Sequence, residues 1–127
     1  MHCRGIRGAT TVGGNTRESI LSATKELLSE IVRANEVSME DVACIFFTTT
    51  ADIDAEFPAL GARELGFTRV PLMCGREIDV PGSLSMCLRI LVLYNTEKSL
   101  DDVVHVYLGD AQVLRPDTVG NDVAEEE

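Results

Sequence analysis

The fold of this chain is decided between residues 42 and 50, which read Val42-Ala43-Cys44-Ile45-Phe46-Phe47-Thr48-Thr49-Thr50. The run is apolar or β-branched throughout, a pattern typical of a strand buried inside a sheet. The segments on either side of it must therefore supply the other strands of that sheet and its cover.

Four further segments carry strand patterns, at residues 3–12, 68–74, 84–94 and 103–108, with residues 111–114 extending the last strand or starting its partner. Residues 84–94 fit a helix or a strand by length, and their β-branched content and strict alternation favour a strand. This alternation puts Leu88, Ile90, Val92 and Tyr94 on one face and Arg89, Leu91 and Leu93 on the other. Gly5 and Gly8 inside the first strand indicate close approach of a ligand or another backbone.

The clearest helix follows Gly13-Gly14. Asn15, with Glu18 three residues later, fits a capping box, and Asn35 is expected to end the helix in a left-handed conformation. A shorter helix is expected at residues 58–65, because Pro58 suits its first position. The result is one α+β domain with about five strands and one long amphipathic helix. That helix covers only one face of the sheet, so we expect another subunit to cover the other face.

Length and charge limit what the protein can be. Its 127 residues fit one domain, which we place at residues 1–116, followed by an acidic, flexible tail at residues 117–127. The net charge of −10 argues against nucleic acid or an anionic membrane as a partner. Five acidic residues lie in the tail, so half of that charge belongs there. Nine of the 11 basic residues are Arg, which suits fixed recognition of carboxylate or phosphate; composition bias is the alternative.

The cysteines and histidines argue against a metal site. The four cysteines have no C-x-x-C spacing and there are only two histidines, so a structural zinc is not expected. No apolar run resembles a signal peptide or a membrane span. We expect a cytoplasmic protein with reduced cysteines.

The residues that could carry chemistry are few. There is no G-x-S-x-G motif and no P-loop, and a Cys74–His105 pair is not excluded by spacing alone. Arg7 and Arg89 lie inside expected strands and Arg115 ends one, where a buried cation must be paired or meet a ligand. For Arg89 two interpretations remain equally open: an ion pair to a carboxylate such as Glu77, or a rigid cation for an anionic substrate.

Several segments, in order, resemble the AroH-class, Bacillus-type chorismate mutases. They are Arg4-Gly5-Ile6-Arg7-Gly8-Ala9-Thr10-Thr11-Val12, Phe57-Pro58-Ala59, Ala62-Arg63, Val70-Pro71-Leu72, Arg76-Glu77, Leu88-Arg89, His105-Val106-Tyr107-Leu108 and Leu114-Arg115-Pro116. The resemblance covers roughly residues 4–117. Leu60 departs from it, because the family pattern has a charged residue there, and this puts any role for position 60 in doubt.

The resemblance implies a fold and a reaction. The fold is a mixed five-stranded sheet with one long helix, assembled as a homotrimeric pseudo-α/β-barrel with active sites between subunits. The reaction is the Claisen rearrangement of chorismate to prephenate in Phe and Tyr biosynthesis, with no metal or organic cofactor and no covalent intermediate.

The resemblance also implies roles for individual residues. Arg89 would stabilise the charge that grows on the ether oxygen, Arg7 would bind the side-chain carboxylate with help from Tyr107, and Glu77 would accept from the ring hydroxyl. Further substrate contacts would come from Cys74 near Glu77, from an apolar wall and from the mouth of the site: Phe57, Ala59 and Met73 for the wall, and Arg63, Leu114 and Arg115 for the mouth.

Two other functions remain as alternatives. One is a trimeric imine or enamine hydrolase of similar architecture, although its motifs are not matched. The other is a non-catalytic trimer that binds a small carboxylate. Arg89 and Glu77 together favour catalysis over binding alone.

Overall fold

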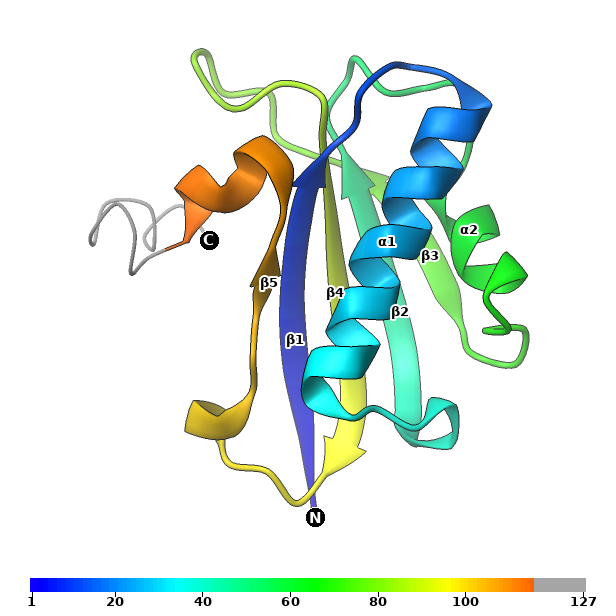
Figure 1. The fold of residues 1–127 in the computed structure, drawn as a ribbon, viewed down its shortest axis with the longest axis vertical. Helices are drawn as coiled ribbons and strands as arrows, with labels where there is room; N and C mark the ends of the chain where they lie inside the picture. Colours follow the sequence, from blue (N-terminus) through cyan, green and yellow to red (C-terminus); the bar gives the residue numbers. More distant parts are fainter. Residues whose placement is uncertain (116–127) are drawn as a thin grey trace.

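The computed structural model describes residues 1–115 and contains a five-stranded sheet in the order β3-β2-β4-β1-β5 (Figure 1). The strands are β1 (His2–Thr11), β2 (Val42–Thr49), β3 (Leu72–Arg76), β4 (Cys87–Thr96) and β5 (Val106–Tyr107). β4 pairs antiparallel with β1 and β2. At the two edges of the sheet, β5 pairs parallel with β1, and β3 pairs parallel with β2. The expected mixed five-stranded sheet is confirmed, with the strand at residues 42–50 in its interior.

The helix after Gly13-Gly14 is α1 (Arg17–Asn35), which lies across one face of the sheet (Figure 1). Its N-cap is Thr16, whose hydroxyl accepts from the Ser19 N–H at 3.1 Å, so the expected capping box of Asn15 and Glu18 is wrong. The left-handed residue at its other end is Glu36, at φ 52°.

Asn35 is buried and does a different job from the one expected. Its side-chain amide bonds both the N–H and the carbonyl of Val104, each at 2.8 Å. The end of α1 is thereby fixed to the chain that leads into β5, which is a tertiary role that the helical pattern does not encode.

The core lies between α1 and the sheet. Ile20, Leu27, Leu28 and Ile31 of α1 are fully buried, in line with the helical spacing of the sequence. On β4 the predicted alternation is confirmed. Leu88, Ile90, Val92 and Tyr94 are at most 3% exposed, whereas Arg89, Leu91 and Leu93 are half-buried on the other face.

Three predicted strands are wrong in their bounds. β4 begins at Cys87 and ends at Thr96, whereas the sequence predicted residues 84–94. β3 starts at Leu72 and not at residue 68, because the chain is still turning after Gly66, at φ 109°, and Pro71 has no N–H to donate. β5 has two residues, and residues 109–114 form a 3₁₀ helix (Gly109–Leu114), not a strand. Gly109, at φ 56°, turns the chain there, so Arg115 does not end a strand.

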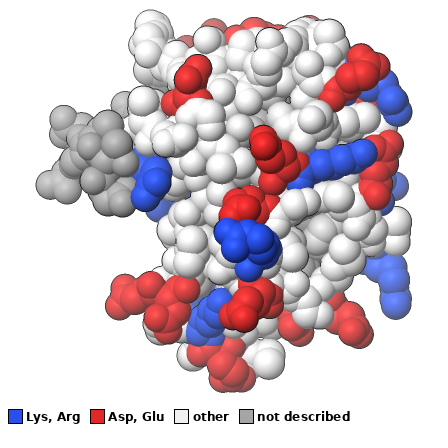
Figure 2. Space-filling view, viewed as in Figure 1, with Lys and Arg blue, Asp and Glu red and all other residues white. Residues whose placement is uncertain are grey.

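The helix α2 (Pro58–Glu64) begins at Pro58 as predicted and packs beside α1. On the α1 side of the molecule, acidic and basic side chains are intermixed and form no basic patch among the residues drawn (Figure 2). No helix within residues 1–115 is long and apolar enough to cross a membrane. The acidic tail expected at residues 117–127 lies outside the described residues.

Candidate functional site

The sheet face turned away from α1 carries two arginines. Cross-strand pairing sets Thr48 of β2, Arg89 of β4, Ala9 of β1 and Tyr107 of β5 side by side. In the next row on the same face, Arg7 of β1 pairs with Leu91. We call the residues Arg7, Thr48, Glu77, Arg89 and Tyr107 the arginine face.

Glu77 follows directly after β3 and is fixed from two sides. Its backbone N–H donates to the carbonyl of Thr49 at 2.9 Å, and its Oε2 accepts from the hydroxyl of Thr48. The same Oε2 lies 3.6 Å from Nε of Arg89. The Arg89 and Glu77 side chains are 27% and 25% exposed, so the pair is mostly removed from solvent.

The remaining arginine-face residues are held by β5 and the segments on either side of it. The N–H of Arg7 donates to Nδ1 of His105 at 2.9 Å, which ties β1 to the chain entering β5. Tyr107 packs with Ala9, Ala111 and Leu114, so the 3₁₀ helix covers this end of the sheet. Arg115 follows that helix and is exposed.

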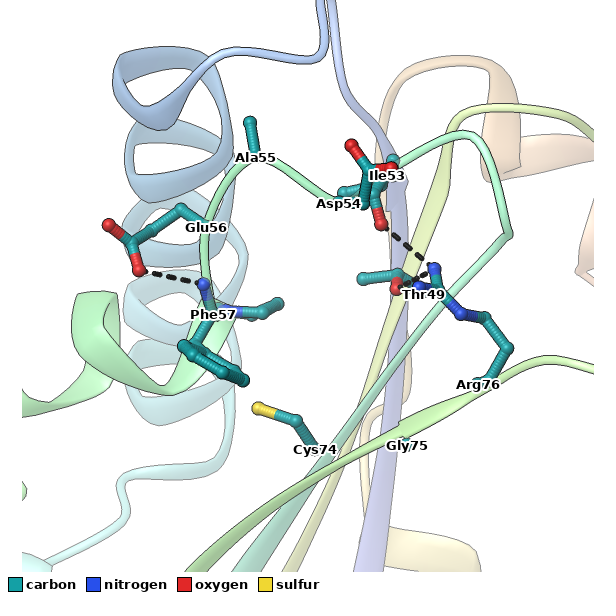
Figure 3. A pocket seen from close by; sticks show the side chains of 10 residues that line it. Thr49, Ile53, Asp54, Ala55, Glu56, Phe57, Cys74, Gly75 and Arg76 are labelled. Carbon is teal, nitrogen blue, oxygen red and sulfur yellow. Dashed lines mark hydrogen bonds between the residues drawn. The ribbon is translucent and has the colours of Figure 1, made fainter.

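A separate surface cavity of about 390 Å³ opens where the loop after β2 meets the end of β3. Phe57, 71% exposed, and Cys74 stand on one side of it, and Arg76 on another (Figure 3). Its lining is completed by Thr49, Ile53, Asp54, Ala55, Glu56, Pro58 and Gly75. Because Cys74 pairs with the core residue Phe47, its side chain lies on the opposite sheet face from Arg89.

The loop that forms this cavity is fixed by hydrogen bonds from three sides. Nη1 of Arg76 donates to Oγ1 of Thr49 at 3.1 Å and to the carbonyl of Ile53 at 2.8 Å (Figure 3). Oδ1 of Asn15 accepts from the N–H of Asp54 at 2.9 Å. The pKa of Asp52 lies below its usual range, first because the hydroxyl of Thr50 donates to it and then because the N–H of Met86 does.

The other expected site residues stand away from the arginine face. Ala59 is half-buried and Arg63 is exposed, both on α2. Met73 is 63% exposed on β3, on the same sheet face as Arg7 but beyond Leu91 and Phe46. Within one chain the structure therefore gathers Arg7, Glu77, Arg89, Tyr107 and Leu114, and leaves Phe57, Ala59, Arg63, Met73 and Cys74 outside that cluster.

Cys74 and His105 do not pair within one chain. Cys74 lies on β3 at one edge of the sheet and His105 precedes β5 at the other edge, with three strands between them. Within residues 1–115 there is also no group of three or more His, Cys, Asp or Glu side chains that could hold a metal ion.

Sequence reasoning missed Thr48, Arg76 and Asn15 as site-forming residues. The sequence places Thr48 only within a buried strand. Its hydroxyl, on the same sheet face as Arg89, is the one feature that could have indicated a role in the site. Arg76 and Asn15 form hydrogen bonds to a loop that is distant from them in sequence, so no local sequence pattern predicts these contacts.

Comparisons with known proteins show the family of the chain. The family model described as chorismate mutase type I matches residues 3–118. The chain is 50% identical over 115 residues to the chorismate mutase AroH of Thermus thermophilus, covering 90% of this chain and 94% of that protein. It is 46% identical over 118 residues to the chorismate mutase AroH of Bacillus subtilis (strain 168), covering 92% and 93%. The solved structure of a chorismate mutase from Clostridium thermocellum superposes with a TM-score of 0.85 at 48% identity, covering 87% of this chain and 98% of that one.

Proposed function

The chain belongs to the chorismate mutase type I family, and from this premise we propose how its residues convert chorismate into prephenate. The protein is a chorismate mutase, an isomerase of aromatic amino acid biosynthesis. The hydrolase and the non-catalytic binder are set aside, because the matching family and the relatives above carry the name of the mutase.

The reaction requires a fixed cation and no nucleophile. In the rearrangement the C–O bond of the enol ether breaks ahead of C–C bond formation, so negative charge grows on the ether oxygen. A guanidinium held at that oxygen stabilises the transition state more than the ground state. Arg89 is the proposed cation, and the observation that supports it most is its position on β4, mostly buried and 3.6 Å from Glu77.

The other arginine-face residues bind and orient the substrate in this proposal. Chorismate has two carboxylates and a ring hydroxyl. Arg7 binds the side-chain carboxylate together with the hydroxyl of Tyr107, and Glu77 accepts from the ring hydroxyl. Leu114 and Arg115 stand at the mouth of the site.

Positioning must supply much of the acceleration. Even a rate gain of about 10⁶ requires ~8 kcal/mol of transition-state stabilisation. One contact to a developing oxyanion supplies about 3–4 kcal/mol. The remainder comes from holding chorismate in its compact pseudo-diaxial shape between two carboxylate anchors and an apolar wall.

A second subunit completes the site in this proposal. Phe57, Ala59, Arg63, Met73 and Cys74 do not join the arginine face within one chain, so a neighbouring copy would present them to it. The sheet face that carries Arg7 and Arg89 also exposes Phe46 and Met73, an apolar surface that suits the interface of a homotrimeric pseudo-barrel.

A cytoplasmic location is supported by four free cysteines, which stay reduced there.

Loss of absorbance at the ultraviolet diene band of chorismate tests the activity directly. The purified protein is expected to consume chorismate well above the uncatalysed background, and a rate equal to background would refute the function. Arg89→Ala is expected to abolish turnover with far-UV circular dichroism unchanged. Arg89→Lys is also expected to fail, because an ammonium cannot make the forked contact of a guanidinium. Near-normal activity of Arg89→Lys would disprove the role given to this guanidinium.

A further inference from the structure

Thr48 occupies a central place on the arginine face. It lies on β2 directly opposite Arg89 of β4. Its hydroxyl donates to Oε2 of Glu77, and the backbone N–H of Glu77 is held by the neighbouring carbonyl of Thr49. Glu77 is thus fixed at its backbone and at one carboxylate oxygen by two consecutive residues of one strand.

Glu77 and Arg89 form an ion pair that is longer than a direct hydrogen bond. Oε2 of Glu77 and Nε of Arg89 are 3.6 Å apart, beyond the roughly 2.7–2.9 Å of a charge-assisted hydrogen bond. Coulomb attraction between partly desolvated charges favours a closer contact. The hydroxyl of Thr48 opposes that movement, because it binds the same carboxylate oxygen that faces Arg89.

A closer contact would work against the reaction. If the carboxylate of Glu77 docked onto the guanidinium, it would occupy the N–H donor that the developing ether oxygen needs. A bidentate contact would also occupy Oε1. With Oε2 on Thr48, Oε1 is the oxygen left to face the substrate.

We propose that Thr48 is a positioning residue, whose hydroxyl holds Glu77 away from Arg89 so that both side chains meet the substrate; this inference rests on the mutase function proposed above. Thr48 acts through Glu77 and does not itself touch the substrate. Loss of the Thr48 hydroxyl should therefore lower kcat more than it raises KM, because the hydroxyl sets the positions of the Glu77 and Arg89 charges relative to the transition state.

The experiment compares Thr48→Val, which keeps the branched shape and loses the hydroxyl, with Thr48→Ser, which keeps the hydroxyl. Thr96→Val is the matched control, since Thr96 is another half-buried strand threonine and lies at the far end of β4. Chorismate turnover is measured for each full-length protein, together with its thermal unfolding and its oligomeric state.

We expect Thr48→Val to lower kcat about tenfold to a hundredfold with KM changed less than about threefold, and Thr48→Ser and Thr96→Val to stay near wild type. Equal losses in Thr48→Val and Thr48→Ser, or a Thr48→Val enzyme within about twofold of wild type, would overturn the inference. If Thr48→Val does not assemble, Thr48→Ala against Thr48→Ser decides, because these two differ only by the hydroxyl. An inactive wild-type protein would refute the function and this inference with it, whereas an active wild type with an unaffected Thr48→Val refutes the inference alone.

Discussion

Asn15 and Thr16 are neighbours with two separate jobs. The hydroxyl of Thr16 caps α1 by accepting from the Ser19 N–H. The amide of Asn15 turns instead to the loop after β2, donating to Oδ1 of Asp54 at 2.8 Å and accepting from the N–H of Ala55 at 3.0 Å. One residue therefore stabilises the helix and the other fixes the loop that leads to Phe57.

Alanine at each position separates these jobs. Thr16→Ala is expected to lower the free energy of unfolding by about 1 kcal/mol, the usual cost of losing an N-cap. Asn15→Ala is expected to leave the N-cap intact and to raise amide hydrogen exchange at Asp54 and Ala55, whose N–H groups lose their acceptor. Urea unfolding and hydrogen exchange measure the two effects. A larger loss of helix stability in Asn15→Ala than in Thr16→Ala would contradict the assignment.

At the scale of elements, β1 and α1 pack unusually closely. A Cβ atom added at Gly8 would lie 2.5 Å from Cδ1 of Ile31 and 3.2 Å from Cδ1 of Leu27. The close approach that the glycine indicated is therefore made by helix side chains, not by a ligand or another backbone. It lets the long helix sit low over the centre of the sheet.

Gly8→Ala tests this packing. The added methyl must displace Ile31 or Leu27, so the free energy of unfolding is expected to fall by about 1–3 kcal/mol. Gly13→Ala is the matched control, because a Cβ there meets nothing within 4 Å. Urea unfolding measures both variants, and equal stability of the two would show that the helix can move away at no cost.

Most strands and both α-helices could be predicted from local patterns. β2 and β4 have continuous or alternating apolar residues, and Pro58 marks the first residue of α2. The segments whose structure differs from the prediction are determined by contacts with residues that are distant in sequence. Leu114 and Ala111 fit a strand by composition, yet Gly109 turns the chain and their side chains pack onto Ala9.

At the scale of the whole molecule, the candidate site residues divide into two sets that do not meet within one chain. Arg89 and Arg7 belong to the arginine face, and Arg63 belongs to α2. The resemblance implies a role for all three residues, but the sequence does not show which of them meet within one chain. That depends on sheet pairing and on the side to which each strand residue points.

Mixed assembly of two inactive variants tests the shared site. Co-expressed Arg89→Ala and Arg63→Glu chains are expected to regain activity, because a mixed trimer of the proposed kind would contain one interface at which both residues are native. Random mixing predicts about a quarter of wild-type turnover. Arg89→Ala mixed with Arg7→Ala is the control and should stay inactive, since both residues lie on the arginine face. Light scattering tests whether the assemblies are trimers, and a failure of the first mixture to recover activity would contradict the division.

The order of strands has a consequence for how the enzyme is made. β1 is the first strand of the chain, yet it lies between β4 and β5, which span residues 87–96 and 106–107. Its two neighbours are synthesised only after α1, β2, α2 and β3. On the ribosome β1 must therefore wait unpaired, and the arginine face, which includes residues of β1, β4 and β5, forms only after residues 106–107 have emerged.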